Sequence, residues 1–101
     1  MLENLEKMLA AGRDSPMLRL SLGQGYLREG DVRQALEHLR SAVEQDPAYS
    51  AAWKLLGKAL ADSGAVDEAR EAYDRGIAVA RERGDLQAAR EMEVFRRRLD
   101  R

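Results

Sequence analysis

The side chains that most often carry chemistry in proteins are scarce in this sequence. His38 is the only histidine and cysteine is absent, which excludes a two-histidine metal site, a thiolate zinc site and a cysteine nucleophile within one chain. Carboxylates are plentiful, but they stand beside lysine or arginine as on solvated helices, and no pair lies in an apolar setting that would raise a pKa. We therefore expect no catalysis, no metal and no cofactor, and we interpret His38 as a surface residue.

Two short segments resemble ligand-binding sequences. Leu22-Gly23-Gln24-Gly25 has the glycines of a phosphate loop, but no strand precedes it and no Gly-Lys-Ser/Thr ending follows. Arg96-Arg97-Arg98 is the one basic run, which we interpret as a terminal turn that complements the helix dipole rather than as a patch for nucleic acid or acidic lipid. Neither segment predicts a phosphate or nucleic-acid site.

Length, charge and hydropathy narrow the classes of function that remain for this chain. The 101 residues suit a single domain, and 17 basic against 18 acidic residues leave no field that would gather nucleic acid or anionic lipid. The first residues are acidic where a secretion signal needs a basic start, and no stretch is apolar enough to span a bilayer. We expect no nucleic-acid partner, no membrane partner and, by default, a cytoplasmic location.

The sequence repeats itself with a period of 34 residues. Residues 16–49 align with residues 50–83 without a gap, which indicates a repeat architecture. In each unit, apolar residues recur at helical spacing on either side of a glycine-containing turn, so that each unit predicts two helices. The identical positions are Leu22/Leu56, Gly23/Gly57, Gly30/Gly64, Val32/Val66, Ala35/Ala69 and Glu37/Glu71.

Six helices account for the whole chain. The two units predict helices at 17–29, 32–45, 50–63 and 66–82. Residues 1–14 predict an N-terminal packing helix, and residues 84–101 predict a C-terminal capping helix that follows a helix end at Gly84. Its apolar stripe is Ala88, Met92, Phe95 and Leu99. The expected fold is all-α, an alpha-alpha superhelix of antiparallel helix pairs in one domain, with repeats at 16–49 and 50–83.

The residues shared by the two units form a family pattern. The second unit carries Trp53, Leu56-Gly57, Leu60, Ala69 and Tyr73, and the first carries Leu22-Gly23, Tyr26, Ala35, Leu39, Ala42 and the closing Pro47. This pattern resembles the tetratricopeptide repeat family over 68 of 101 residues. It departs from the family at Arg19, Gly76 and Arg81, which replace an aromatic residue, an alanine and the closing proline. The resemblance implies a protein-protein interaction module.

Two glycines stand at equivalent places inside helices, where each costs about 1 kcal/mol against alanine. We expect Gly23 and Gly57 to permit close helix approach, with small Ala35 and Ala69 facing them and larger side chains one turn away. Tyr26, Trp53 and Tyr73 are then core residues, whereas we expect Tyr49, at the junction between units, to be exposed.

The resemblance also implies where a protein or peptide would bind, because the first helix of each unit lines the concave surface. The candidate binding residues are Met17, Leu20, Gln24, Leu27, Arg28, Lys54 and Lys58, with Ala51, Ala61, Asp62, Ala88 and Met92 as possible additions. The apolar side chains among them predict an interface unless a terminal helix covers them. A second interpretation is self-association, in which the same apolar face is a homodimer seam.

The best-known binding mode of the family grips a peptide's C-terminal carboxylate with lysine and asparagine side chains. The matching positions here hold Leu20, Gln24, Leu55, Asp85 and Ala89. The resemblance therefore does not carry that recognition of chaperone tails to this chain.

Overall fold

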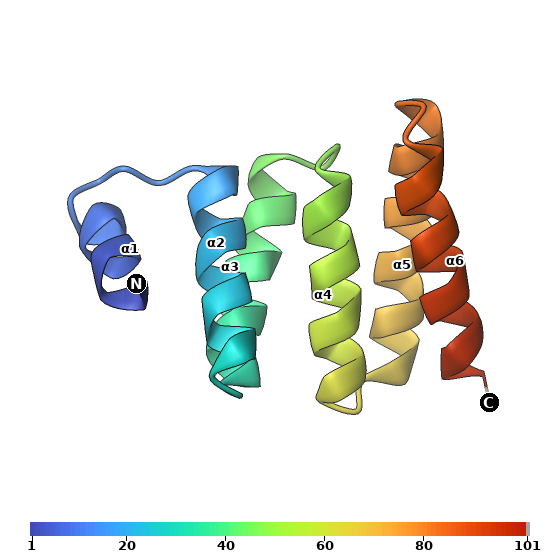
Figure 1. Ribbon diagram of the computed structural model, residues 1–101, viewed down its shortest axis with the longest axis horizontal. Helices are drawn as coiled ribbons and strands as arrows, with labels where there is room; N and C mark the ends of the chain where they lie inside the picture. The colour runs from blue at the N-terminus through green and yellow to red at the C-terminus, as the bar shows by residue number, and fades with distance from the viewer. Residues whose placement is uncertain (101) are drawn as a thin grey trace.

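The computed structural model describes residues 1–100, which fold into six α-helices connected by short turns (Figure 1). The predicted boundaries of the four repeat helices are confirmed to within one residue, and the all-α class is confirmed. The helices are α1 (Leu2–Ala10), α2 (Pro16–Arg28), α3 (Val32–Gln45), α4 (Ser50–Asp62), α5 (Val66–Glu82) and α6 (Leu86–Leu99).

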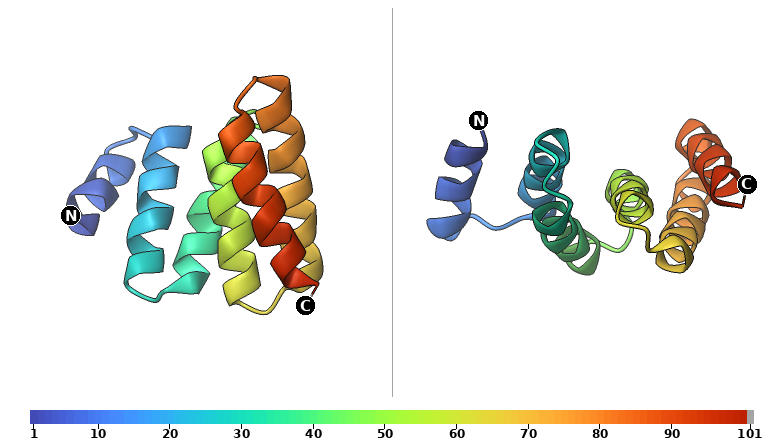
Figure 2. Two further views of the ribbon diagram at one scale, coloured as in Figure 1. Left: turned by 45° about the vertical axis from the view of Figure 1, so that its right-hand side comes forward. Right: turned by 90° about the horizontal axis from the view of Figure 1, so that it is seen from below.

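The helices form two layers. In Figure 1, α2, α4 and α6 lie toward the viewer, and α3 and α5 lie behind them. Seen from below, α4 is set deeper than α2 and α6, so that the front layer is concave (Figure 2, right). The first helix of each repeat therefore lines the hollow face, as the family resemblance implies.

Three hairpins are closed by the same turn. Gly30, Gly64 and Gly84 have positive φ values of 79°, 88° and 77°, the left-handed conformation in which only glycine is free of strain. The residue after each glycine donates its amide to a carbonyl in the last turn of the preceding helix, as Asp85 does to Ala80 at 2.8 Å. The predicted helix end at Gly84 is confirmed, and the α5–α6 connection matches the connections inside the repeats.

A glycine against a large side chain sets the separation of the helices in each hairpin. A Cβ atom on Gly23 would lie 2.5 Å from Leu39, and one on Gly57 would lie 2.5 Å from Tyr73. The close approach is therefore as predicted, but the facing residue is not. Ala35 and Ala69 are fully buried elsewhere in the helix contact, and the space left by each glycine holds Leu39 or Tyr73 instead.

The α5–α6 hairpin uses the same device. A Cβ atom on Gly76 would lie 2.5 Å from Met92 Sδ and 2.8 Å from Trp53 Cβ. Met92 follows Gly76 by the same number of residues as Leu39 follows Gly23. The placement of Met92 on the binding surface is therefore wrong, because its side chain is 0% exposed and fills the gap that Gly76 leaves.

The N-terminal helix α1 is the most loosely attached element. None of its residues is buried, and its Leu2 side chain contacts α2 where Gly25 lacks a Cβ. The segment that joins it to α2 is held by Asp14, which accepts hydrogen bonds from Arg19 and Gln45. The packing helix is present as expected, but it covers α2 only partly.

The glycine contacts predict that alanine substitution destabilises the fold more at Gly57 than at Gly25. We expect Gly57→Ala to lower the free energy of unfolding by about 1–3 kcal/mol, because the new methyl group meets the buried ring of Tyr73. Gly25→Ala should change it by less than about 0.5 kcal/mol, because the Leu2 side chain on α1 can move and alanine favours the helix. Urea unfolding followed by circular dichroism measures both, and equal losses in the two variants would contradict this account.

Candidate partner-binding surface

The residues predicted to bind a partner differ in exposure. Met17 is 70% exposed, and Gln24, Arg28 and Lys58 are also exposed on the front layer. The apolar patch expected on α2 is smaller than predicted, because its two leucines are half-buried and packed against the core. These are Leu20 and Leu27. Whether the predicted residues bind a partner stays a prediction.

One cavity of about 220 Å³ lies between the N-terminal halves of α4 and α6. Its lining includes Ala51 and Lys54 from α4, and Ala88 and Glu91 from α6. Lys54 Nζ donates to Glu91 Oε1 at 3.3 Å, so that an ion pair joins the two helices across the concave face. Ala51 is exposed and Ala88 is partly exposed, which leaves small side chains on this part of the surface.

A second cavity, of about 310 Å³, lies between the C-terminal halves of α4 and α6. Tyr73, Phe95 and Leu99 provide its apolar lining, and the ring centroids of Tyr73 and Phe95 are 6.0 Å apart. Charged side chains from α4 and α6 complete the wall. These are Lys58, Asp62 and Arg98.

A third cavity of about 310 Å³ separates α1 from the concave side of α2. Gln24 and Arg28 line it together with Leu5 of α1. The N-terminal helix therefore borders the predicted binding residues at this end of the array. It does not bury them, because both Gln24 and Arg28 remain exposed.

The prediction that His38 is a surface residue is wrong, because His38 is only 4% exposed and lies at the junction of α1, α2 and α3. Its ring stacks on Tyr26, with centroids 5.5 Å apart and planes within 7°. Arg19 donates to His38 Nδ1 at 3.1 Å, which places the proton of the neutral ring on Nε2. Burial lowers the pKa of His38, and the nearby Arg19 charge acts in the same direction.

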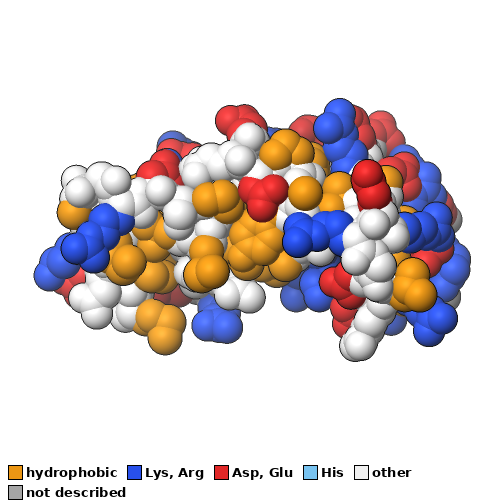
Figure 3. All heavy atoms as spheres, turned by 90° about the horizontal axis from the view of Figure 1, so that it is seen from above, with side chains coloured by type: hydrophobic (Ala, Val, Ile, Leu, Met, Phe, Trp, Pro, Cys, Tyr) orange, Lys and Arg blue, Asp and Glu red, His pale blue; other side chains and the backbone are white. Residues whose placement is uncertain are grey.

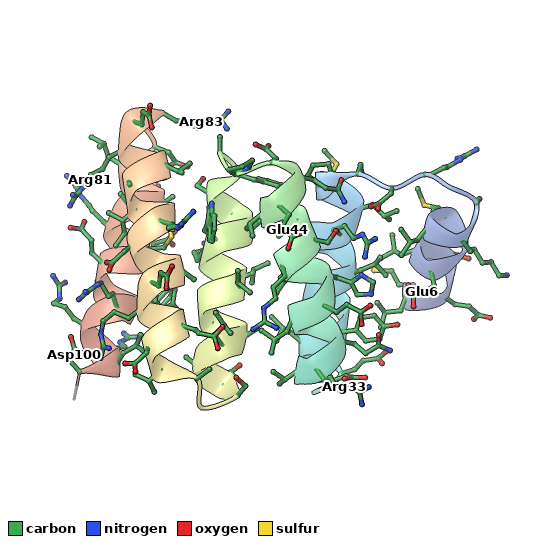
Figure 4. All side chains as sticks on the ribbon, turned by 180° about the vertical axis from the view of Figure 1, so that it is seen from behind. Glu6, Arg33, Glu44, Arg81, Arg83 and Asp100 are labelled. Carbon is green, nitrogen blue, oxygen red and sulfur yellow. The ribbon has the colours of Figure 1, made fainter. Side chains whose placement is uncertain are left out.

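Acidic side chains complete this junction. Tyr26 donates its hydroxyl to Glu6 Oε2 at 2.8 Å, and this bond, together with burial, raises the pKa of Tyr26 to about 12. Figure 4 shows Glu6 on the side of α1 that faces α2 and α3. Arg19 pairs with Asp14 through two hydrogen bonds, which hold the pKa of Asp14 well below its usual range. The Tyr26 hydroxyl, His38 Nδ1 and Asp14 each have a hydrogen-bond partner within the chain, which is typical of a structural network.

The 34-residue period did not reveal the contribution of α6 to the concave face. When the last segment is aligned with the 34-residue units, Arg90-Glu91 stands where the repeats have Leu-Gly, a difference that predicts only a capping helix. The signal was Gly76, which has a large residue, Met92, at the spacing that Gly23 and Gly57 show. That spacing pairs α6 with α5 and brings Phe95 and Arg98 beside Tyr73.

The geometry matches a known family. A family model described as tetratricopeptide repeat matches residues 26–92, from α2 to the middle of α6. A TPR repeat-containing protein of Pseudomonas aeruginosa is 56% identical over 101 residues, which is all of this chain and 96% of that protein. The chain belongs to the tetratricopeptide repeat family.

Solved structures agree with this tetratricopeptide repeat assignment. The solution structure of a Bordetella parapertussis protein has a TM-score of 0.85 and 47% identity, covering 99% of this chain and 87% of that one. A tetratricopeptide repeat domain protein from Salinibacter ruber has a TM-score of 0.80 and 30% identity, over 86% of this chain and 97% of that one.

A co-chaperone is also among the relatives. A heat-shock protein cognate co-chaperone of Aspergillus fumigatus is 30% identical over 86 residues, which is 85% of this chain but 25% of the co-chaperone. The Sgt2 tetratricopeptide repeat domain from the same organism has a TM-score of 0.73 and 28% identity, over 95% of this chain and 68% of that one.

The surface of the tetratricopeptide repeat array is uneven in charge. Seen from above, hydrophobic side chains gather over the middle of the array, and charged side chains crowd the end formed by α5 and α6 (Figure 3). Within residues 1–100, no helix is long and apolar enough to cross a membrane, and no group of three or more metal-ligating side chains is found.

The buried imidazole predicts a pH dependence of stability. Because the pKa of His38 is lower in the folded chain than its usual 6.5, the unfolded chain binds more protons between the two values. The contribution of the neutral His38 ring to the free energy of unfolding is fully present above pH 6.5. It is lost as the pH falls through the pKa of His38 in the folded chain. Urea unfolding at pH 7.5 and 5.5 should show this loss in the wild type and a smaller one in His38→Gln. An equal loss in both proteins would contradict it.

Proposed function

We propose that this tetratricopeptide repeat protein binds a protein or peptide on its concave face and catalyses no reaction. The observation that carries the proposal is the pair of cavities between α4 and α6, which follow one another along the hollow side of the array. Binding sites for peptides are concave and combine apolar surface with a few polar groups. The cavity lined by Tyr73, Phe95 and Leu99 has this composition, and the cavity beside Ala51 and Ala88 extends it with a mainly polar lining.

The comparisons support the class of partner. The family is one of protein-interaction modules, and one relative is named as a co-chaperone. The specific partner of that co-chaperone does not follow, because the residues that would grip a C-terminal carboxylate are absent at the matching positions of this chain. We therefore propose a protein segment that lies along α4, the floor of the concave face.

The absence of catalysis is part of the proposal. His38 is engaged by Arg19 and Tyr26 at the junction of α1, α2 and α3, and it lines neither cavity between α4 and α6. The Asp14 carboxylate, whose pKa lies well below its usual range, is held by ion pairing with Arg19 rather than poised for proton transfer.

A pair of alanine substitutions tests the binding face. Ala51 and Ala78 are both exposed on helices, but Ala51 lines the cavity between α4 and α6, whereas Ala78 lies on α5 in the rear layer. Peptides selected from a displayed library against the wild type should bind Ala51→Trp at least tenfold more weakly, because the ring fills the groove. Calorimetric titration should give unchanged affinity for Ala78→Trp. Equal affinities for both variants would move the site away from the concave face.

Self-association is the alternative use of the same face, and its test is separate. Met17 is the large apolar side chain that remains exposed on α2, so Met17→Glu would break a seam there without disturbing the core. Leu20→Glu is a poorer choice, because Leu20 packs against the core. We expect sedimentation equilibrium to give a monomer for both wild type and Met17→Glu. A wild-type dimer that Met17→Glu dissociates would favour assembly over partner binding.

A further inference from the structure

The cavity between the C-terminal halves of α4 and α6 contains donor groups that have no partner. Lys58 and Arg98 form no ion pair within the part of the chain that the structure describes, although several neighbouring charges are paired. Arg96, two residues before Arg98, is bound to Asp74, and Lys54, one turn before Lys58, is bound to Glu91. Among the described residues, Lys58 and Arg98 are therefore unpaired cations that line the cavity, whereas their near neighbours Lys54 and Arg96 are paired.

Tyr73 adds a third donor. Its side chain is 3% exposed, yet its hydroxyl has no hydrogen-bond partner among residues 1–100, and no fully buried polar atom there is left unpaired. The hydroxyl must therefore reach the surface of the cavity that Tyr73 lines. Burial and the charge of Asp62 raise the pKa of Tyr73 to about 12, so that it carries its proton and can donate at neutral pH.

The apolar part of the cavity lies next to these donors. Phe95 and Leu99 line it from α6, and the Arg98 guanidinium carbon lies 5.6 Å from the Phe95 ring centroid. This contact places a cation directly beside apolar surface, and a cation–π contact at an exposed site is weak, so Arg98 remains available for an anion. The cavity volume of about 310 Å³ is sufficient for a single large side chain.

We propose that this cavity binds one apolar side chain of a partner segment together with an adjacent internal aspartate or glutamate. The apolar side chain contacts Phe95 and Leu99, and the carboxylate accepts from Lys58, Arg98 and the Tyr73 hydroxyl. Asp62 at the same rim disfavours phosphates and densely acidic segments, which limits the site to a single carboxylate. The inference rests on the proposed function, because Lys58 continues the line of Lys54 and Ala51 along α4.

Peptides of defined charge test the chemistry. The probe is Gly-Ser-Phe-Asp-Ser-Gly, acetylated and amidated so that the aspartate side chain is its only charge, and the controls replace aspartate by asparagine or phenylalanine by alanine. Two exposed ion pairs correspond to about a fivefold preference for the aspartate peptide over the asparagine peptide. In titrations followed by nitrogen-15 chemical shifts, the resonances of Ala61 and Phe95 should move, and the alanine peptide should move neither.

Matched variants test whether the preference for the aspartate peptide arises in this cavity. In Lys58→Gln/Arg98→Gln most of the preference for the aspartate peptide should be lost, because only the Tyr73 hydroxyl remains as a donor. The preference should persist in Arg90→Gln/Arg97→Gln, which loses the same charge at exposed positions of α6 outside the cavity. Tyr73→Phe should reduce the preference while the thermal unfolding midpoint stays within about 2 °C, which separates a lost donor from a disturbed core.

The outcomes separate this inference from the proposed function. Equal binding of the aspartate and asparagine peptides by the wild type, or a preference that is undiminished in Lys58→Gln/Arg98→Gln, overturns the inference. Concave-face binding still stands in either case if Ala51→Trp weakens binding of the selected peptides. Failure of the phenylalanine peptides to shift Ala61 and Phe95 overturns the inference as well. Unchanged affinity in Ala51→Trp overturns the proposed function independently of these titrations.

Discussion

The structure depends on a contact that requires the absence of a side chain. In each hairpin a glycine on the first helix leaves room for a large residue on the second, and the pairs are Gly23 with Leu39, Gly57 with Tyr73, and Gly76 with Met92. Since a Cβ atom at any of these glycines would lie about 2.5 Å from the partner, the helices are held closer than alanine would permit. The hairpins therefore share one geometry, and stacking hairpins of one geometry produces the curvature that makes the front layer concave.

The tyrosines at the two ends of the array differ in whether their hydroxyl groups have partners within the chain. At the N-terminal end the Tyr26 hydroxyl donates to Glu6 and His38 Nδ1 accepts from Arg19, so that the tyrosine hydroxyl is satisfied within the chain. At the C-terminal end the Tyr73 ring is buried in a hairpin contact, and its hydroxyl lines a cavity with no partner among residues 1–100. A satisfied network stabilises the fold, whereas unpaired donors beside apolar surface gain free energy when a ligand with a carboxylate binds.

Much of the fold could be predicted because the repeat period fixes helix type, length and pairing at once. Gly23 and Gly57 were identifiable because each occupies the same place in an otherwise apolar helix pattern. The identity of the facing residue was not, since Ala35 and Leu39 both lie on the inner face of α3 and only coordinates distinguish them. His38 was misassigned although a signal existed: it follows Ala35 by three positions, a spacing that places it on the buried face of the helix. Its polar character outweighed its position in that prediction.

The composition of the C-terminal cavity follows from the loss of one proline. Pro47 ends the first repeat, and a four-residue connection, Asp46 to Tyr49, leads into α4, where the Pro47 carbonyl accepts from Trp53 Nε1 at 2.8 Å. Arg81 stands at the equivalent position of the second repeat, so α5 continues to Glu82 and the chain turns through Gly84 as it does inside a repeat. The next helix is then a hairpin partner of α5, and it presents Phe95 and Leu99 to Tyr73. A proline at the second junction would have favoured the longer connection, and the apolar lining beside Lys58 and Arg98 depends on its absence.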